Sequence, residues 1–139
     1  MKRKKIFLDT NVVLDFVLNR IEFVENARTI FLWHEAGRIQ IYVSALTLAN
    51  IAYIVKKNGK DPFVVVSELI KWVEVIPLEL LHFQKNATSD FKDFEDGLQY
   101  FSALETADIE AIVTRDITDF RTAGIPVITP TDFVKMDME

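Results

Sequence analysis

Three aspartates occupy positions at which a carboxylate can bind a cation or activate a water molecule. Asp9 directly follows the apolar run 6–8, and Asp116 comes shortly after the apolar run 111–113. Asp96 falls in the first turn of a segment whose apolar residues have helical spacing. Taken alone, Asp9 fits an N-cap of the helix that begins near Asn11 better than a catalytic role, and Asp116 likewise fits a cap of the short turn after its strand. The presence of all three aspartates in one chain favours a single site.

Together these aspartates predict a site for a hard divalent cation. Carboxylates that converge repel one another and raise one another's pKa, and a divalent cation is the usual means of keeping them ionised. Mg²⁺ and Mn²⁺ prefer oxygen ligands, keep several waters and bridge to phosphate oxygens. Such an ion lowers the pKa of a bound water and stabilises the charge of phosphodiester cleavage. The pattern leaves open whether one ion or two would bind.

The elements that must position these residues alternate between strands and helices. Strands are expected at 5–8, 39–43, 73–76, 110–114 and 126–128, and helices at 11–18, 21–35, 45–57, 62–73, 77–87, 93–106 and 131–136. Ser44 and Asp61 are expected N-caps, and Gly37 and Gly59 follow helix ends. The sequence therefore predicts an α/β fold, a three-layer α/β/α sandwich around a central parallel β-sheet. Ligands bind beyond the carboxyl ends of the strands in such folds.

Composition limits the class of protein. The chain has 139 residues, of which half are hydrophobic, so we expect residues 1–139 to form a single domain with a sizeable core. It contains no cysteine, which excludes disulfides, thiolate zinc sites and a cysteine nucleophile. No apolar run approaches the roughly 20 residues of a membrane span, and the N-terminal apolar stretch is too short for a signal peptide. We therefore expect a soluble, cytoplasmic protein without a membrane partner.

The chain carries an excess of negative charge. The formal net charge is −5, whereas nucleic-acid binders are generally basic. The acidic residues crowd the C-terminal third, from about 90 to 119. A cluster of carboxylates that attracts cations would produce this balance, and an ordinary solvated acidic surface, the commoner cause, would do so equally.

Three motifs resemble those of PIN-domain proteins, a nuclease family that includes the toxins of VapBC-type toxin–antitoxin pairs. The motifs are Phe7-Leu-Asp-Thr-Asn-Val12, Asp93-Phe-Glu-Asp-Gly-Leu-Gln99 and Thr114-Arg-Asp-Ile-Thr-Asp-Phe120, and the segment Ile125-Pro-Val-Ile-Thr-Pro130 also fits. Each motif alone is modest, but their order and spacing together are specific. The resemblance extends from about Lys5 to Val134, which is almost the whole chain.

The resemblance implies a metal-dependent ribonuclease whose acidic quartet holds Mg²⁺ or Mn²⁺. Three quartet members, implied as catalytic residues and metal ligands, match Asp9, Asp96 and Asp116, and the supporting positions match Asn11, Thr114 and Asp119. Family toxins are homodimers held by helices, and a small antitoxin silences them. Aromatic stretches around Phe16 and Phe31, or around Phe63 and Trp72, are candidates for a dimer face, although core packing is expected for most of them.

The chain departs from the family at the second acidic position. That residue is usually a glutamate in the helix after the second strand, and the matching position here holds Asn50. Asparagine offers a carbonyl oxygen but no negative charge, so a buried structural amide and a metal or water ligand are both open roles. Asp93, which shares a face of the first helical turn with Asp96, is a candidate for the missing charge. The departure leaves an alternative function open, an inactive PIN domain that binds RNA or a protein.

Basic residues near the acidic motifs are candidates for contact with an RNA substrate. Arg115, beside Asp116, is the best placed to contact a substrate phosphate. The others considered are Lys2, Arg3, Lys4, Lys5, Lys56, Lys57, Lys60, Lys92 and Arg121, for which a solvated face is the usual role.

Other enzyme classes fit less well. A phosphate-transfer enzyme with an aspartyl nucleophile at the position of Asp9 commonly has a second aspartate two residues later, where this chain has Asn11. The four glycines are too dispersed to form a glycine-rich phosphate loop, and no Gly-x-Ser-x-Gly elbow occurs. His34 and His82 are isolated and are expected to be surface or packing residues.

Overall fold

Five parallel strands form the central sheet of the protein in a computed structural model, which describes residues 3–106, 108–120 and 124–137. The strands are β1 (Lys4–Leu8), β2 (Ile39–Ser44), β3 (Glu74–Ile76), β4 (Ile109–Val113) and β5 (Val127–Ile128). Their order across the sheet is β3-β2-β1-β4-β5, and each neighbouring pair is parallel. The central place of β1 puts the carboxyl ends of β1 and β4 side by side.

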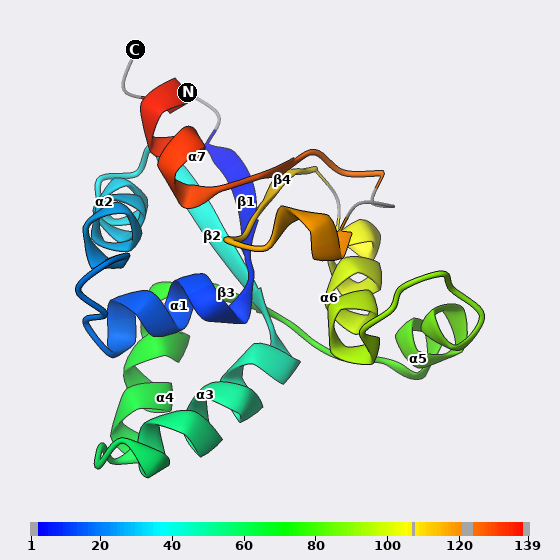
Figure 1. Ribbon diagram of the computed structural model, residues 1–139, viewed down its shortest axis with the longest axis horizontal. Helices are drawn as coiled ribbons and strands as arrows, with labels where there is room; N and C mark the ends of the chain where they lie inside the picture. The colour runs from blue at the N-terminus through cyan, green and yellow to red at the C-terminus, as the bar shows by residue number, and fades with distance from the viewer. Residues whose placement is uncertain (1–2, 107, 121–123, 138–139) are drawn as a thin grey trace.

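Helices cover both faces of this sheet. They are α1 (Thr10–Val17), α2 (Val24–Glu35), α3 (Ala45–Lys57), α4 (Pro62–Trp72), α5 (Leu80–Ala87), α6 (Phe94–Glu105), α7 (Pro130–Asp137) and the short 3-10 helix η1 (Ile117–Phe120). Figure 1 shows the strands between α1 and α2 on one side and α6 on the other. The predicted three-layer α/β/α sandwich around a parallel sheet is therefore confirmed.

Successive residues of β1 face opposite layers of the core. Ile6 and Leu8 pack in the hydrophobic cluster that includes Ile30 of α2, whereas Phe7 packs in the cluster that includes Tyr100 of α6. The three strand residues are fully buried. A strand that is buried on both faces needs apolar side chains at every position, which explains the uninterrupted run at 6–8.

Local signals place most helix ends where the sequence predicts them. Ser44 caps α3 and Asp61 caps α4, and each side chain accepts a hydrogen bond from the backbone nitrogen two residues later. Gly37 and Gly59 have φ angles of +82° and +78° in the turns after α2 and α3, a conformation that favours glycine. These caps and stops orient α3, which lies beside the candidate site.

Two helices begin later than the sequence predicts. Helix α2 begins at Val24 because 21–23 form a turn, and α5 begins at Leu80 because Glu79 and His82 exchange side-chain and backbone hydrogen bonds in a capping box. His34 and His82 are both buried, in agreement with a packing role. No helix within the described residues is long and apolar enough to cross a membrane.

Candidate functional site

The carboxylate of Asp9 lies at the centre of the polar network at the carboxyl end of β1. Its Oδ1 accepts hydrogen bonds from the backbone of Thr10 at 2.7 Å and from Nε2 of Gln99 at 3.0 Å. Its Oδ2 accepts from the Thr114 hydroxyl at 2.7 Å and from Nδ2 of Asn11 at 3.2 Å. Asp9 is thus the N-cap of α1 and also the hub of the candidate site, so the two interpretations of this residue are compatible.

Burial changes the acidity of Asp9. The residue is only 6% exposed, and this burial raises the pKa of its carboxyl group. The hydrogen bonds from Thr114, Gln99 and Thr10 lower the pKa, and the charge of Asp116 raises it again. The resulting pKa lies above the usual value, so this carboxylate gains from a nearby positive charge.

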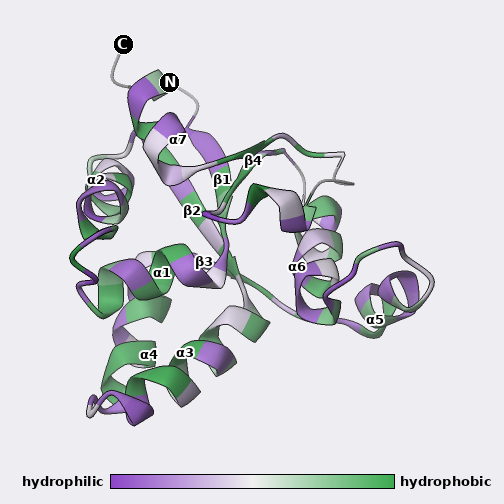
Figure 2. Cartoon of the chain, viewed as in Figure 1, coloured by the Kyte–Doolittle hydropathy of each residue, from purple (hydrophilic) through white to green (hydrophobic). Residues whose placement is uncertain are grey.

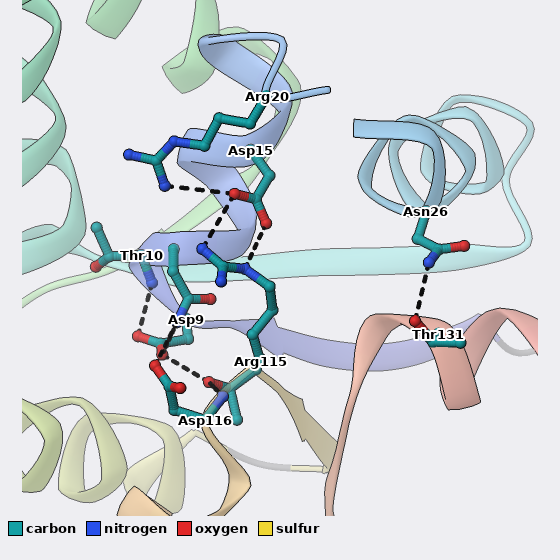
Figure 3. Close-up of polar contacts among 10 residues, drawn as sticks. Asp9, Thr10, Asp15, Arg20, Asn26, Arg115, Asp116 and Thr131 are labelled. Carbon is teal, nitrogen blue, oxygen red and sulfur yellow. Dashed lines mark hydrogen bonds and ion pairs between the residues drawn. The ribbon is translucent and has the colours of Figure 1, made fainter. Parts of the chain in front are cut away.

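Asn11 and Thr114 join Asp116 to Asp9. Nδ2 of Asn11 donates to an oxygen of each carboxylate, both at 3.2 Å. The Thr114 hydroxyl donates to Asp9 and accepts from the backbone nitrogen of Asp116 at 3.1 Å. Oδ1 of Asn11 is buried and has no hydrogen-bond partner among the described residues. Figure 3 shows Asp9 and Asp116 side by side.

Asp96 faces the same group of carboxylates from α6. Its burial, and then the charges of Asp9, Asp93, Asp119 and Asp116 in decreasing order, raise its pKa to about 7. Asp93 caps α6, because its Oδ1 accepts from the backbone nitrogen of Asp96 at 3.0 Å. Asp93, Asp96 and Asp119 also line one hollow beside η1. The structure therefore brings these acidic residues together, as the sequence predicts.

Asn50 lies on the α3 side of the site and is half-buried rather than enclosed. Its Nδ2 donates to Oε1 of Glu95, an exposed residue on α6, at 2.8 Å. Sequence reasoning missed both Glu95 and Gln99. Their spacing of four residues, which puts Glu95 on the same helix face as Gln99, is a signal that could have found them.

Arg115 occupies a different environment from the one expected of a free phosphate ligand. Its Nε and Nη2 donate to the two carboxylate oxygens of Asp15 at 2.8 and 3.3 Å, and its guanidinium carbon lies 3.9 Å from the ring centroid of Phe23. Arg20 also contacts Asp15, at 3.4 Å (Figure 3). This arrangement anchors the chain directly before Asp116. A phosphate contact by Arg115 stays a prediction, and Lys2 and Arg121 lie outside the described residues.

A second hollow adjoins Asp116 on the side of α2 and α7. Arg115, Phe23 and Thr131 line it together with Asp116. Nδ2 of Asn26 donates to the Thr131 hydroxyl at 3.0 Å, which ties α2 to the start of α7 (Figure 3). The carboxylates are thus accessible from this side and from the hollow beside η1.

The side chains of the site fit a hard divalent cation. The atoms available to bind a metal are carboxylate oxygens, and Oδ1 of Asn11, which has no hydrogen-bond partner among the described residues, adds an uncharged oxygen. Burial, and then repulsion by the neighbouring aspartates, raises the pKa of Asp96, so a cation would relieve an unfavourable accumulation of charge. Within the described residues, no three acidic or histidine side chains already stand as a complete ligand set.

Solved structures share this fold. VapBC2 from Rickettsia felis, bound to a DNA fragment from its promoter, matches with a TM-score of 0.65 and 17% identity over 90% of this chain and 98% of that chain. A toxin–antitoxin complex from Klebsiella pneumoniae matches with a TM-score of 0.64 and 22% identity over 90% and 97% of the two chains. PAE2754 from Pyrobaculum aerophilum matches with a TM-score of 0.61 and 14% identity over 99% and 91%. At these identities the likeness establishes the fold.

Sequence comparison establishes the family. A search of curated proteins produced no match. A family model for the PIN domain matches residues 5–118, which include Asp9, Asp96 and Asp116. Since this match spans most of the chain, the protein belongs to the PIN-domain family.

Proposed function

We propose that this protein is a Mg²⁺- or Mn²⁺-dependent endoribonuclease and the toxin of a VapBC-type toxin–antitoxin pair. The observation that carries the proposal is the meeting of Asp9, Asp96 and Asp116 at the carboxyl ends of β1 and β4, where burial and mutual repulsion raise the pKa of Asp96. Such a group of carboxylates is suited to a divalent cation. Membership of a family of nucleases supports the same chemistry.

Each residue of the site has a proposed role. Asp9, Asp96 and Asp116 would hold the cation, and Oδ1 of Asn11 is a further available donor. The bound cation would lower the pKa of a water molecule and stabilise the charge that develops in phosphodiester cleavage. Thr114 and Asn11 orient the carboxylates through their hydrogen bonds. Asp93 and Asp119, which line the hollow with Asp96, add negative charge that attracts the cation.

The proposed partners are RNA, a small antitoxin and a second copy of the chain. The Klebsiella pneumoniae neighbour is a toxin–antitoxin complex, which supports an antitoxin partner. Figure 2 shows hydrophobic colour over much of α3 and α4, and Phe63 of α4 is 83% exposed, whereas Phe16 and Phe31 stack in the core. Phe63 is therefore the stronger candidate for a dimer face. A cytoplasmic location and a single domain over residues 1–139 belong to the same proposal.

Cleavage of a mixed RNA pool tests the proposed function. We expect products from the wild-type protein with Mg²⁺ or Mn²⁺, none with EDTA, and none from Asp96→Asn. The isosteric variant Glu110→Gln, at the opposite end of β4, is a control for the loss of one negative charge. Absence of any product that depends on both metal and Asp96 refutes the nuclease proposal. Mn²⁺ binding without cleavage would favour the alternative, a binding module for RNA or protein.

A further inference from the structure

Helices α3 and α6 face each other through two polar contacts beside Asp9. Thr47 donates to Oε1 of Gln99 at 3.3 Å, and Nδ2 of Asn50 donates to Oε1 of Glu95 at 2.8 Å. Thr47 and Asn50 are three residues apart on α3, and Glu95 and Gln99 are four apart on α6. Residues with these spacings share a helix face, so the two contacts lie one helical turn apart between the helices. We call the Thr47–Gln99 contact the inner rung and the Asn50–Glu95 contact the outer rung.

The inner rung is joined directly to the site. Nε2 of Gln99 donates to Oδ1 of Asp9 at 3.0 Å, and the hydroxyls of Thr47 and Thr10 share a hydrogen bond of 2.8 Å. The outer rung, Asn50 with Glu95, therefore stands one helical turn from the contacts of Asp9. A hollow lined by Thr10, Asn50, Tyr53, Lys57 and Glu95 opens at this place.

The outer rung restores the charge that the chain lacks at position 50. Asn50 is neutral, and its amide donates a hydrogen bond, which a glutamate at this position could not do. Glu95 accepts that bond and brings one carboxylate to the α3 side of the site. The pair thus carries the same net charge as a glutamate on α3, with the carboxylate supplied from the opposite helix.

We propose that Glu95 is the fourth acidic residue of the cation site and that Asn50 is the residue that positions it, an inference that rests on the proposed function. Asp93 is less suited to this part because it does not line the hollow beside Asn50. Asp93 lines the hollow that contains Asp96 and Asp119, whereas Glu95 lines the hollow that contains Asn50. The two hollows therefore hold different carboxylates, and Glu95 belongs to the hollow on the side of α3.

The affinity of the full chain for Mn²⁺, measured by calorimetry without RNA, tests this proposal. Removing an outer-shell partner of a metal site typically weakens metal binding about 10- to 100-fold, and we expect Glu95→Gln to weaken Mn²⁺ binding by about tenfold or more. Glu110→Gln, which also removes one carboxylate charge isosterically but lies at the opposite end of the sheet, should bind Mn²⁺ like the wild type. Equal affinities for these two variants would overturn the proposal.

A reversed pair separates positioning from a merely structural role. In the double variant Asn50→Glu/Glu95→Gln the amide donates from α6 and the carboxylate stands on α3, so the hydrogen bond and the net charge are both kept. We expect this variant to recover Mn²⁺ affinity to within about threefold of the wild type, whereas Asn50→Ala should lose affinity because Glu95 is no longer held. Failure of the reversed pair to recover affinity, with its helix content and Tm unchanged, would also overturn the proposal.

The same titrations distinguish this inference from the proposed function. If the wild type binds no Mn²⁺, or binds it equally well after Asp96→Asn, the metal site itself is refuted. If the wild type binds Mn²⁺ and needs Asp96, but Glu95→Gln matches Glu110→Gln, only the role of Glu95 is refuted.

Discussion

The buried carboxylate of Asp15 allows a direct test of how the chain after β4 is held beside the site. Asp15 on α1 is 1% exposed and accepts two hydrogen bonds from the guanidinium of Arg115, at 2.8 and 3.3 Å. Arg20 makes a third contact, at 3.4 Å. Asp15→Asn removes the negative charge with almost no change in volume, and it leaves two guanidinium groups without their counter-ion.

The size of the effect follows from the burial of the three partners. Breaking a buried ion pair by changing one partner costs about 3–5 kcal/mol, because the other charge is left uncompensated. The side chains of Arg115 and Arg20 are 27% and 37% exposed, so water relieves part of this penalty. We therefore expect Asp15→Asn to lower the free energy of unfolding by about 2–3 kcal/mol. This loss corresponds to a fall in Tm of roughly 6–12 °C.

Urea unfolding followed by circular dichroism measures this loss, and Glu22→Gln, an exposed acid in the following turn, is the matched control. Arg115→Lys keeps the charge but not the two-pronged contact, and we expect it to lose part of the same stability. A free energy of unfolding for Asp15→Asn within about 0.5 kcal/mol of the wild type would refute this reasoning. If Arg115→Lys weakened RNA binding without lowering stability, the predicted phosphate contact would be the better account of Arg115.

Two further predictions concern α6. A Cβ at Gly97 would lie 1.8 Å from Oδ1 of Asn86, a buried side chain whose Nδ2 donates a hydrogen bond to the Phe94 carbonyl. Gly97→Ala should therefore lower the free energy of unfolding, measured by urea titration, by about 1–3 kcal/mol. Unchanged stability would mean that α5 and α6 do not approach as closely as described. Burial and neighbouring carboxylates raise the pKa of Asp96 to about 7, so the folded protein holds this proton more tightly than the unfolded chain. The stability of the metal-free protein should therefore fall as pH rises from the ordinary value of 3.8 through about 7. Urea unfolding in EDTA across the range from pH 3.8 to about 7 measures this fall, and an unchanged pH slope in Asp96→Asn would contradict it.

The positions of most elements could be predicted from the sequence because the signals that set them are local. A cap such as Ser44 acts on backbone nitrogens within a few residues, and a buried strand such as 6–8 needs apolar side chains wherever it lies. The starts of α2 and α5 were predicted too early, since apolar spacing continues into turns whose hydrogen bonds the spacing does not reveal. The meeting of Asp9 and Asp116 was also predictable, because parallel strands put their carboxyl ends at one edge, and Asp96 lies at the start of the helix that leads into β4.

The sequence by itself therefore determined the layered α/β class, the caps and the acidic residues at the strand ends. Only the tertiary structure decided which side chains those residues meet, because each contact joins elements far apart in the chain. Arg115 meets Asp15 across 100 residues, and Asn50 meets Glu95 across 45. Such pairs depend on the order of the strands and on where each helix lies beside the sheet. Hydrophobic periodicity tells which face of an element is buried, but it does not tell which neighbour buries it.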